Sequence, residues 1–330
     1  MIGVRGSRPA LSDRDAELRN ALAESGFGDW DRTPLAGDAS RRRYERLSRA
    51  GDTRILMDAP LETAGDIRPF LRIAEHLSGI GLHPPRIDFA DSARGVIVME
   101  DFGDDLLARH SVQYPHQEAE FYVAAAEILA HLQACPPAPD LPRLDATEGV
   151  RLVVEVADWL PGSATSKDAL LAELDAALRR YSGGGLVMAL RDYHAENLVV
   201  CSNSAGLRRL GLLDFQDAVL ADPTYDLVSL LRDVRRVVGR EANDAAVARF
   251  AELTGTDHAD LGPALAVQAV QRNLRILGVF TRLARRDGKS RYLDYVPRLS
   301  RLLTEDLAHP DLAALNETAT EITKATAHET

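Results

Sequence analysis

Two acidic residues on either side of a predicted hairpin constrain this chain more than any other feature. Asp192 stands five positions before Asn197, and Asp214 directly follows an apolar run. The apolar runs NLVVC at residues 197–201 and RLGLLDF at residues 209–215 are separated by a polar segment that favours a turn. Because an antiparallel pair of strands returns the chain to its starting point, the pattern predicts that Asn197 and Asp214 lie close together.

These residue types suit the transfer of a phosphoryl group. The reaction needs an acceptor for the proton of the attacking hydroxyl, and it needs oxygen ligands for Mg²⁺. Asp192 would supply the first, and Asn197 together with Asp214 the second. The alternative interpretation is that Asp192 and Asp214 only cap a helix and a turn.

The composition is typical of a globular protein. The 330 residues, 45% of them hydrophobic, fit two domains, and the net charge of -11 repels nucleic acids and anionic membranes. The N-terminus lacks the apolar stretch of a signal peptide, and no apolar segment is long enough to cross a membrane. The two cysteines form no disulfide framework. We expect a cytoplasmic protein with no nucleic-acid or membrane partner.

Helix and strand patterns divide the chain into two parts, with a boundary near Gly103. The first part is predicted to contain, in order, a helix at 12–26, a hairpin of two strands between 33 and 60, a helix at 66–78 and a strand at 96–99. The second is predicted to add helices at 116–135, 167–181, 225–238, 241–253, 263–285 and 292–307. The polar residues 317–330 are expected to fray.

The segment RDYHAENLVVCSNSAGLRRLGLLDFQD resembles the catalytic loop and metal-binding turn of the aminoglycoside phosphotransferase-like small-molecule kinases, which are relatives of the protein kinases. The resemblance covers roughly residues 30–305. It implies that Asp192 is the catalytic base, that Asn197 and Asp214 hold Mg²⁺, and that ATP is the phosphoryl donor.

The same resemblance implies a fold. It is an α+β, bilobal protein-kinase-like fold, with a small mixed β-sheet N-lobe that has one helix and a larger, mainly helical C-lobe. Residues 1–103 would be the N-lobe and bind the nucleotide. Residues 104–330 would be the C-lobe and carry the catalytic loop, the metal site and the sugar site.

Several strings resemble a narrower group. AGDASRRRYERL, ILMDAP, DFQDAVLADPTYDLVSLLRD and QRNLRILGVFTRLARRDGKSRYL are similar to the bacterial anomeric sugar kinases, which phosphorylate N-acetylmuramate and N-acetylglucosamine at the C1 hydroxyl in peptidoglycan recycling. This implies a small-molecule amino sugar as substrate, and we expect a monomer. Since an anomeric hydroxyl is more acidic than an ordinary alcohol, a carboxylate base of modest strength suffices.

The resemblance also places contacts to the nucleotide phosphates. The string GDASRRRY occupies the position of a glycine-rich loop between two strands. Backbone amides at Gly37, Asp38 and Ser40 would bind the phosphates. Arg42 or Arg43 would add a cation, although both arginines could equally solvate an exposed strand.

Two further positions bear on nucleotide binding. Met57 stands where the protein-kinase relatives carry a phosphate-binding lysine, and no lysine precedes Lys167. The string VMEDFG occupies the position of the hinge, so backbone groups of Glu100, Asp101 and Phe102 would bind adenine. A plain strand end followed by an acidic turn is the alternative interpretation.

The sugar would be bound by polar and aromatic residues near Asp192. Asp217 supplies a second carboxylate for sugar hydroxyls, and Trp159 could stack on a pyranose ring or belong to the core. Tyr193 and His194 lie in the catalytic loop itself, where His194 could instead hold the loop. Arg232 is a further candidate.

Other charged residues leave alternatives open. Asp226 begins a helix pattern and is predicted to steady the catalytic loop. Arg272, Arg275 and Arg282 recur at helical spacing, so they would either pair with a substrate carboxylate or form a solvated face. Glu196 replaces a basic residue that is frequent in the similar kinases, which disfavours an acidic sugar.

Two other functions are compatible with the residues. The same fold could phosphorylate another hydroxyl, on an aminoglycoside, choline or another sugar position. A catalytically silent nucleotide-binding module is the second alternative. The missing lysine favours that module, whereas the intact set of Asp192, Asn197 and Asp214 opposes it.

Overall fold

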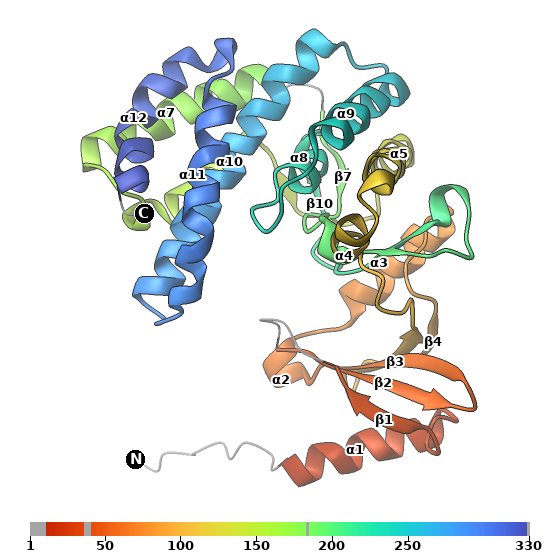
Figure 1. Cartoon of the computed structure of the whole chain (residues 1–330). Helices are drawn as coiled ribbons and strands as arrows, with labels where there is room; N and C mark the ends of the chain where they lie inside the picture. The colour runs from red at the N-terminus through yellow and green to blue at the C-terminus, as the bar shows by residue number, and fades with distance from the viewer. Residues whose placement is uncertain (1–10, 36–40, 183–184, 329–330) are drawn as a thin grey trace, which may run out of the picture. The chain divides into compact units, whose positions relative to one another are not determined.

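The computed structural model describes residues 11–35, 41–182 and 185–328 and divides the chain into two compact units (Figure 1). Unit 1 consists of Met1–Gly79 and His83–Asp104, and unit 2 of Ile80–Leu82 and Asp105–Thr330. The functions expected for residues 1–103 and 104–330 stay predictions. None of the helices in the described ranges is long and apolar enough to cross a bilayer.

Unit 1 is built on a five-stranded sheet with the spatial order β1-β2-β3-β5-β4. Its strands are β1 (Asp31–Pro34), β2 (Arg43–Arg49), β3 (Asp52–Asp58), β4 (Ile87–Asp91) and β5 (Val96–Glu100). β2 and β3 form the predicted hairpin, which turns at Ala50 and Gly51, both with positive φ. Every pairing in this sheet is antiparallel, so the expectation of a mixed sheet was wrong in that detail.

Three helices accompany this sheet in the described part of unit 1, where the helix patterns predicted two and the family resemblance implied one. They are α1 (Leu11–Glu24), α2 (Leu61–Ala64) and α3 (Arg68–Gly79). Leu18 and Leu22 of α1 pack against Leu47, Leu56 and Val98 of the sheet. The sheet side chains that meet α1 come from alternate positions of the strands, as expected when one face of a sheet is covered.

Unit 2 is mainly helical. Its α-helices are α4 (Leu107–Gln113), α5 (Glu118–Ala134), α6 (Ala146–Val154), α7 (Ala164–Tyr181), α8 (Tyr225–Leu231), α9 (Arg240–Thr254), α10 (His258–Arg285), α11 (Val296–Leu307) and α12 (Ala313–His328). Its strands are β6 (Arg143–Leu144), β7 (Val187–Ala189), β8 (Leu198–Val200), β9 (Leu210–Leu212) and β10 (Val219–Ala221). β8 pairs with β9, and β6, β10 and β7 form a second small sheet.

The long helix α10 organises the core of unit 2. Val270, Leu274 and Leu277 of α10 lie in one buried cluster with Leu299 and Leu303 of α11, and Figure 1 shows the two helices side by side. At Gly278, an added Cβ would stand 2.6 Å from the side chain of Val156. Only glycine permits this approach, which sets the position of α10.

The C-terminal residues differ from expectation. Residues 317–330 were expected to fray, yet α12 runs through most of them. Leu315, Ala319 and Ile322 recur at helical spacing and are buried in the same cluster as Leu170 and Leu174 of α7. Few apolar residues suffice here because the neighbouring helices supply the rest of the core.

Candidate functional site

The hairpin of β8 and β9 brings the predicted metal ligands together. The strands are antiparallel, with Leu198 opposite Leu212. The backbone N–H of Leu213 donates to the carbonyl of Asn197 at 2.9 Å. Asp214 directly follows Leu213, so Asn197 and Asp214 stand at the same open end of the hairpin. The predicted hairpin is confirmed.

The loop that carries Asp192 is held at both of its ends. Before Asp192, the buried carboxylate of Asp226 accepts hydrogen bonds from the backbone N–H groups of Leu190 (2.5 Å) and Arg191 (3.0 Å). After it, the side-chain amide of Asn197 donates to the carbonyl of Asp192 at 2.9 Å. Arg191 has a φ of 73°, a conformation that such bonds must hold in place. The expectation that Asp226 steadies this loop is confirmed.

Two carboxylates of this site have raised pKa values. Burial raises the pKa of Asp192, the charge of Asp214 raises it further, and Arg272 opposes the shift. Burial also raises the pKa of Asp226 to about 7, although the hydrogen bonds that it accepts from two backbone N–H groups lower it. The negative charge of Asp214 close to the buried Asp192 is typical of a site that receives a cation with its ligand.

The donor set at the end of the hairpin fits Mg²⁺. Asn197 uses its amide NH₂ on the loop, which leaves its amide oxygen as the ligand atom. The side chain of Asp214 is exposed, and Gln216 donates to one of its oxygens at 2.9 Å. Among the described residues no three His, Cys, Asp or Glu side chains form a metal site. Two protein ligands suffice for Mg²⁺ when phosphates and water complete its shell.

A cavity of about 350 Å³ opens beside Asp192. Asp217 lies in its wall, so the structure brings this predicted sugar-binding residue and Asp192 together. Helix α10 supplies another part of the wall through Arg272 and Arg275. The volume lies in the range of small-molecule sites.

Tyr193 and His194 do not line this cavity, although both were predicted to contact the sugar. Tyr193 is 2% exposed, and its hydroxyl donates to the carbonyl of Ala125 in α5 at 2.9 Å. Burial raises its pKa well above the usual value. His194 is also buried, with Nε2 3.3 Å from the side-chain nitrogen of Asn197. The structure therefore makes Tyr193 a support of the loop, and the prediction of a sugar contact is corrected.

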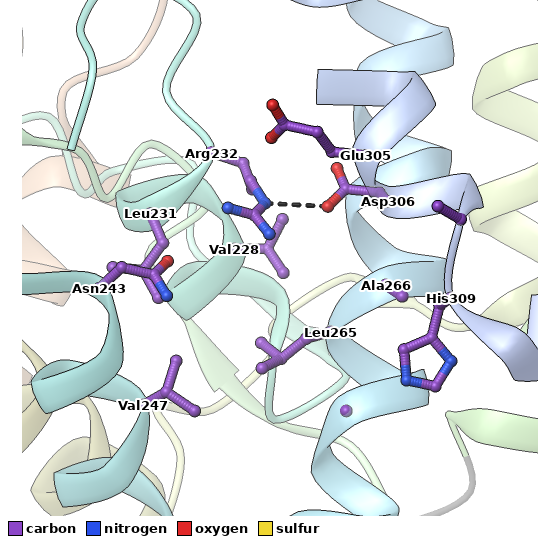
Figure 2. Close-up of a pocket in the computed structure, with 12 residues that line it drawn as sticks. Val228, Leu231, Arg232, Asn243, Val247, Leu265, Ala266, Glu305, Asp306 and His309 are labelled. Carbon is purple, nitrogen blue, oxygen red and sulfur yellow. Dashed lines mark hydrogen bonds and ion pairs between the residues drawn. The ribbon is translucent and has the colours of Figure 1, made fainter. Parts of the chain in front are cut away.

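Arg232 points to a different cavity, of about 320 Å³, which Figure 2 shows. Its Nε donates to the buried carboxylate of Asp306 at 2.9 Å. Burial raises the pKa of Asp306 to about 6, while Arg232 opposes the shift. Arg232 is absent from the wall of the Asp192 cavity, and so is the half-buried Trp159. The structure does not bring these two predicted residues to Asp192.

The predicted phosphate contacts are only partly described. Gly37, Asp38 and Ser40 lie outside the described residues. Arg43 donates through Nε and Nη2 to one oxygen of the buried Asp58, at 2.9 and 2.5 Å. The guanidinium of Arg43 is therefore bound within the protein, which weakens its predicted role.

The other oxygen of Asp58 accepts a hydrogen bond from Nε of Arg14 at 2.9 Å. Met57, the neighbour of Asp58 in β3, is completely buried. The position expected to carry a lysine is thus part of the core of unit 1, and a buried carboxylate between two arginines follows it.

The predicted hinge residues also have partners within unit 1. The N–H of Glu100 donates to the carbonyl of Arg86 at 2.9 Å, so this N–H is not available to adenine, while the contact through the carbonyl of Glu100 stays a prediction. The carboxylate of Asp101 pairs with Arg46 at 2.6 Å. The ring of Phe102 packs edge-on against that of His83, with centroids 4.7 Å apart.

Some residues of the cavity wall were missed from sequence. Tyr225, Arg235 and Phe280 line the Asp192 cavity, but none was a candidate. The available signal was the spacing of Arg272 and Arg275 along α10, because side chains three and four positions apart share one face of a helix. The same face of α10 would have indicated Val279 as a further wall residue. Tyr225 and Arg235 lie outside α10, so the spacing of the arginines gives no indication of them.

Comparison with known proteins agrees with this arrangement. The model of the phosphotransferase enzyme family matches residues 31–264. An N-acetylmuramate/N-acetylglucosamine kinase from Caulobacter vibrioides is 37% identical over an alignment of 349 positions, gaps included, that covers 92% of this chain and 95% of the relative. The protein of the same name from Pseudomonas aeruginosa is 31% identical, with 92% and 93% covered.

The fold of this chain is similar to that of solved structures. A choline/ethanolamine kinase family protein from Mesorhizobium loti superposes with a TM-score of 0.64 at 17% identity, covering 92% of this chain and 98% of that one. The predicted α+β protein-kinase-like fold class is confirmed. With its fold and most of its length matched, the chain belongs to the phosphotransferase enzyme family and is an enzyme that transfers phosphate.

Proposed function

We propose that this chain is an ATP-dependent kinase that phosphorylates the anomeric C1 hydroxyl of N-acetylmuramate, N-acetylglucosamine or both, in peptidoglycan recycling. The observation that carries the proposal is the joint placement of Asp192, the Asn197 and Asp214 pair, and a cavity of about 350 Å³ within unit 2. The names of relatives that match over nine tenths of the chain support the choice of sugar.

Asp192 acts as the base in the proposed reaction. The C1 hydroxyl gives its proton to the carboxylate of Asp192 while its oxygen attacks the γ-phosphorus of ATP. The bond from that phosphorus to the bridging oxygen breaks, and ADP leaves. Burial and the charge of Asp214 raise the pKa of Asp192, which makes its carboxylate a stronger base toward the acidic anomeric hydroxyl.

Asn197 and Asp214 are the proposed ligands of Mg²⁺. When bound with ATP, the ion neutralises charge on the phosphates and orients them. Asn197 has a second task, because its amide also holds the carbonyl of Asp192. One side chain therefore couples the position of the base to the position of the metal site.

The sugar lies against Asp217 and the aromatic residues of the cavity wall in this proposal. Asp217 accepts hydrogen bonds from sugar hydroxyls, and Tyr225 and Phe280 offer apolar surface to the ring. Among the phosphate contacts, we retain Arg42 together with Gly37, Asp38 and Ser40. At the hinge we retain the backbone of Asp101 and Phe102 and the carbonyl of Glu100.

The proposal includes a monomeric enzyme in the cytoplasm, where ATP is available. Its partners are the nucleotide and the amino sugar alone. Size-exclusion chromatography with light scattering tests the oligomeric state, and a mass near twice 36.0 kDa would contradict the monomer.

The function is tested with Mg-ATP and a panel of N-acetylmuramate, N-acetylglucosamine, glucosamine, choline and kanamycin. Phosphorus NMR identifies the phosphorylated position. We expect a sugar 1-phosphate from an N-acetylated sugar and no product from choline or kanamycin. A 6-phosphate or a phosphorylated aminoglycoside overturns the anomeric assignment, and no turnover of any acceptor overturns the substrate proposal altogether.

A further inference from the structure

The arginines around the Asp192 cavity differ in what they bind. Arg235 pairs with Glu196 and with Asp233, each at 3.3 Å. Arg272 donates through Nε to the hydroxyl of Ser229 at 3.0 Å. Both side chains are therefore engaged by groups of the protein. The pairing of Glu196 with Arg235 also means that the negative charge of Glu196 is met within the fold.

Arg191 and Arg275 are the two other arginines of the cavity wall. The charge of Arg191 acts on two carboxylates, because it lowers the pKa of both Glu148 and Asp192. Arg275 is half-buried, and within the described ranges its side chain makes no hydrogen bond or ion pair. A partly desolvated guanidinium without a carboxylate is unfavourable by itself, so this position is prepared for an anion from outside the protein.

The helix that carries Arg275 holds it firmly at the cavity. Arg275 lies one turn after Arg272, and the apolar Ile276 and Val279 share its side of α10 in the wall. The close approach of Gly278 to Val156 leaves α10 no room to shift toward that residue. The position of Arg275 relative to Asp192 is thus set by the core of unit 2.

We propose that Arg275 binds the carboxylate of N-acetylmuramate and so determines the preference for an acidic over a neutral amino sugar. The inference rests on the proposed function. N-acetylmuramate is N-acetylglucosamine with a lactyl ether in place of one hydroxyl, so the two sugars differ by this group and by the charge of its carboxylate. An arginine can hold a carboxylate through two parallel hydrogen bonds, whereas the neutral sugar offers it no charge.

The test compares both sugars on the same Arg275→Gln preparation. The KM for N-acetylmuramate should rise about 10- to 100-fold, the effect of losing a charge-assisted hydrogen bond. The KM for N-acetylglucosamine should stay within about twofold, which also shows that the variant is folded. Arg275→Lys should give an intermediate KM for N-acetylmuramate, because it keeps the charge and loses the bidentate geometry.

Arg286→Gln is the matched control. Arg286 follows α10, is exposed and pairs with Asp287, so this change removes the same charge away from the cavity. Both KM values should be unchanged. An equal rise for both sugars in Arg275→Gln, or no rise for either, overturns the role of Arg275 while the proposed function stands. A wild-type enzyme that phosphorylates neither sugar overturns the proposed function, and the Arg275 assignment with it.

Discussion

Two cavities of unit 2 have similar volumes but differ in whether the protein pairs the arginines of their walls. One, of about 350 Å³, lies beside Asp192, and the other, of about 320 Å³, beside Arg232. Residues of α8 and α10 line both. In the first, Arg275 has no carboxylate partner among the described residues, whereas in the second, Arg232 is paired with the buried Asp306.

This difference separates a ligand site from a structural ion pair. Near Asp192, burial and the charge of Asp214 raise the pKa of Asp192, and Arg275 lacks a carboxylate partner among the described residues, as expected of a site that binds a charged ligand. In the second cavity, the charges of Arg232 and Asp306 neutralise each other within the protein. An arginine in a cavity indicates ligand binding only when the protein does not supply its counter-charge.

The largest expected effect is at the first cavity, on the chemical step. Asp192→Asn should lower kcat about 10³-fold, because the side chain can no longer take the proton of the hydroxyl. Nucleotide binding, measured by calorimetry, should be retained. Asp306→Asn in the second cavity should leave kcat within about twofold. Activity retained in Asp192→Asn would remove this residue from the role of base.

The support of the catalytic loop should have the next largest effect. Asp226→Asn replaces one acceptor oxygen by an NH₂ group, so one of the N–H groups of Leu190 and Arg191 loses its partner. Displacement of the loop should lower kcat about 100-fold with little change in the KM for the sugar. Steady-state kinetics at a temperature where both proteins are folded measure this. A changed KM with an unchanged kcat would contradict a positioning role.

At the second cavity we expect an effect on stability alone. Arg232→Met removes the partner of a carboxylate whose side chain is 3% exposed. The free energy of unfolding should fall by about 2 kcal/mol, since a buried carboxylate is left without its cation. Urea unfolding measures the loss. A higher KM for the sugar in this variant would restore Arg232 as a substrate ligand and erase the contrast between the cavities.

The smallest effect is the pH dependence that Asp306 contributes. Its pKa of about 6 in the folded protein exceeds the value of about 4 expected in the unfolded chain, so folding binds its proton more tightly. This stabilisation is complete below about pH 4 and is lost as the pH rises through 6.

Unfolding free energies of wild type and Asp306→Asn between pH 4 and 7 measure this contribution. As the pH rises, the wild type should lose unfolding free energy relative to Asp306→Asn, by on the order of 1 kcal/mol. A difference that does not vary with pH would show that Asp306 has the same pKa in both states.

Much of the candidate site could be predicted because its parts are encoded locally. Asp192 and Asn197 share one loop, and the hairpin that approaches Asp214 is visible as two apolar runs around a turn. Asp226 was recognisable at the start of a helix pattern. In each case the neighbours in space are also close in sequence, or one hairpin connects them.

The incorrect predictions concern partners that are distant in sequence. Arg232 meets Asp306, 74 positions away, so no local pattern shows that its charge is already paired. Asp58 also binds Arg14 of α1, 44 positions away, whereas its pairing with Arg43 lies across the hairpin of β2 and β3 and could have been read from the sequence. Helix α12 was missed for the same reason, because its stability comes from packing against α7 and α11 rather than from its own composition.

The sequence by itself determined the family, the kinase-like fold class and the set of Asp192, Asn197 and Asp214, since these depend on residue types at short spacings. Only the tertiary structure decided which charges are already neutralised. It removed Tyr193 and Arg232 from the sugar site and left Arg275 at the cavity without a carboxylate. The physical reason is that the charge state of a cavity depends on all the side chains that reach it, and long-range packing brings those together.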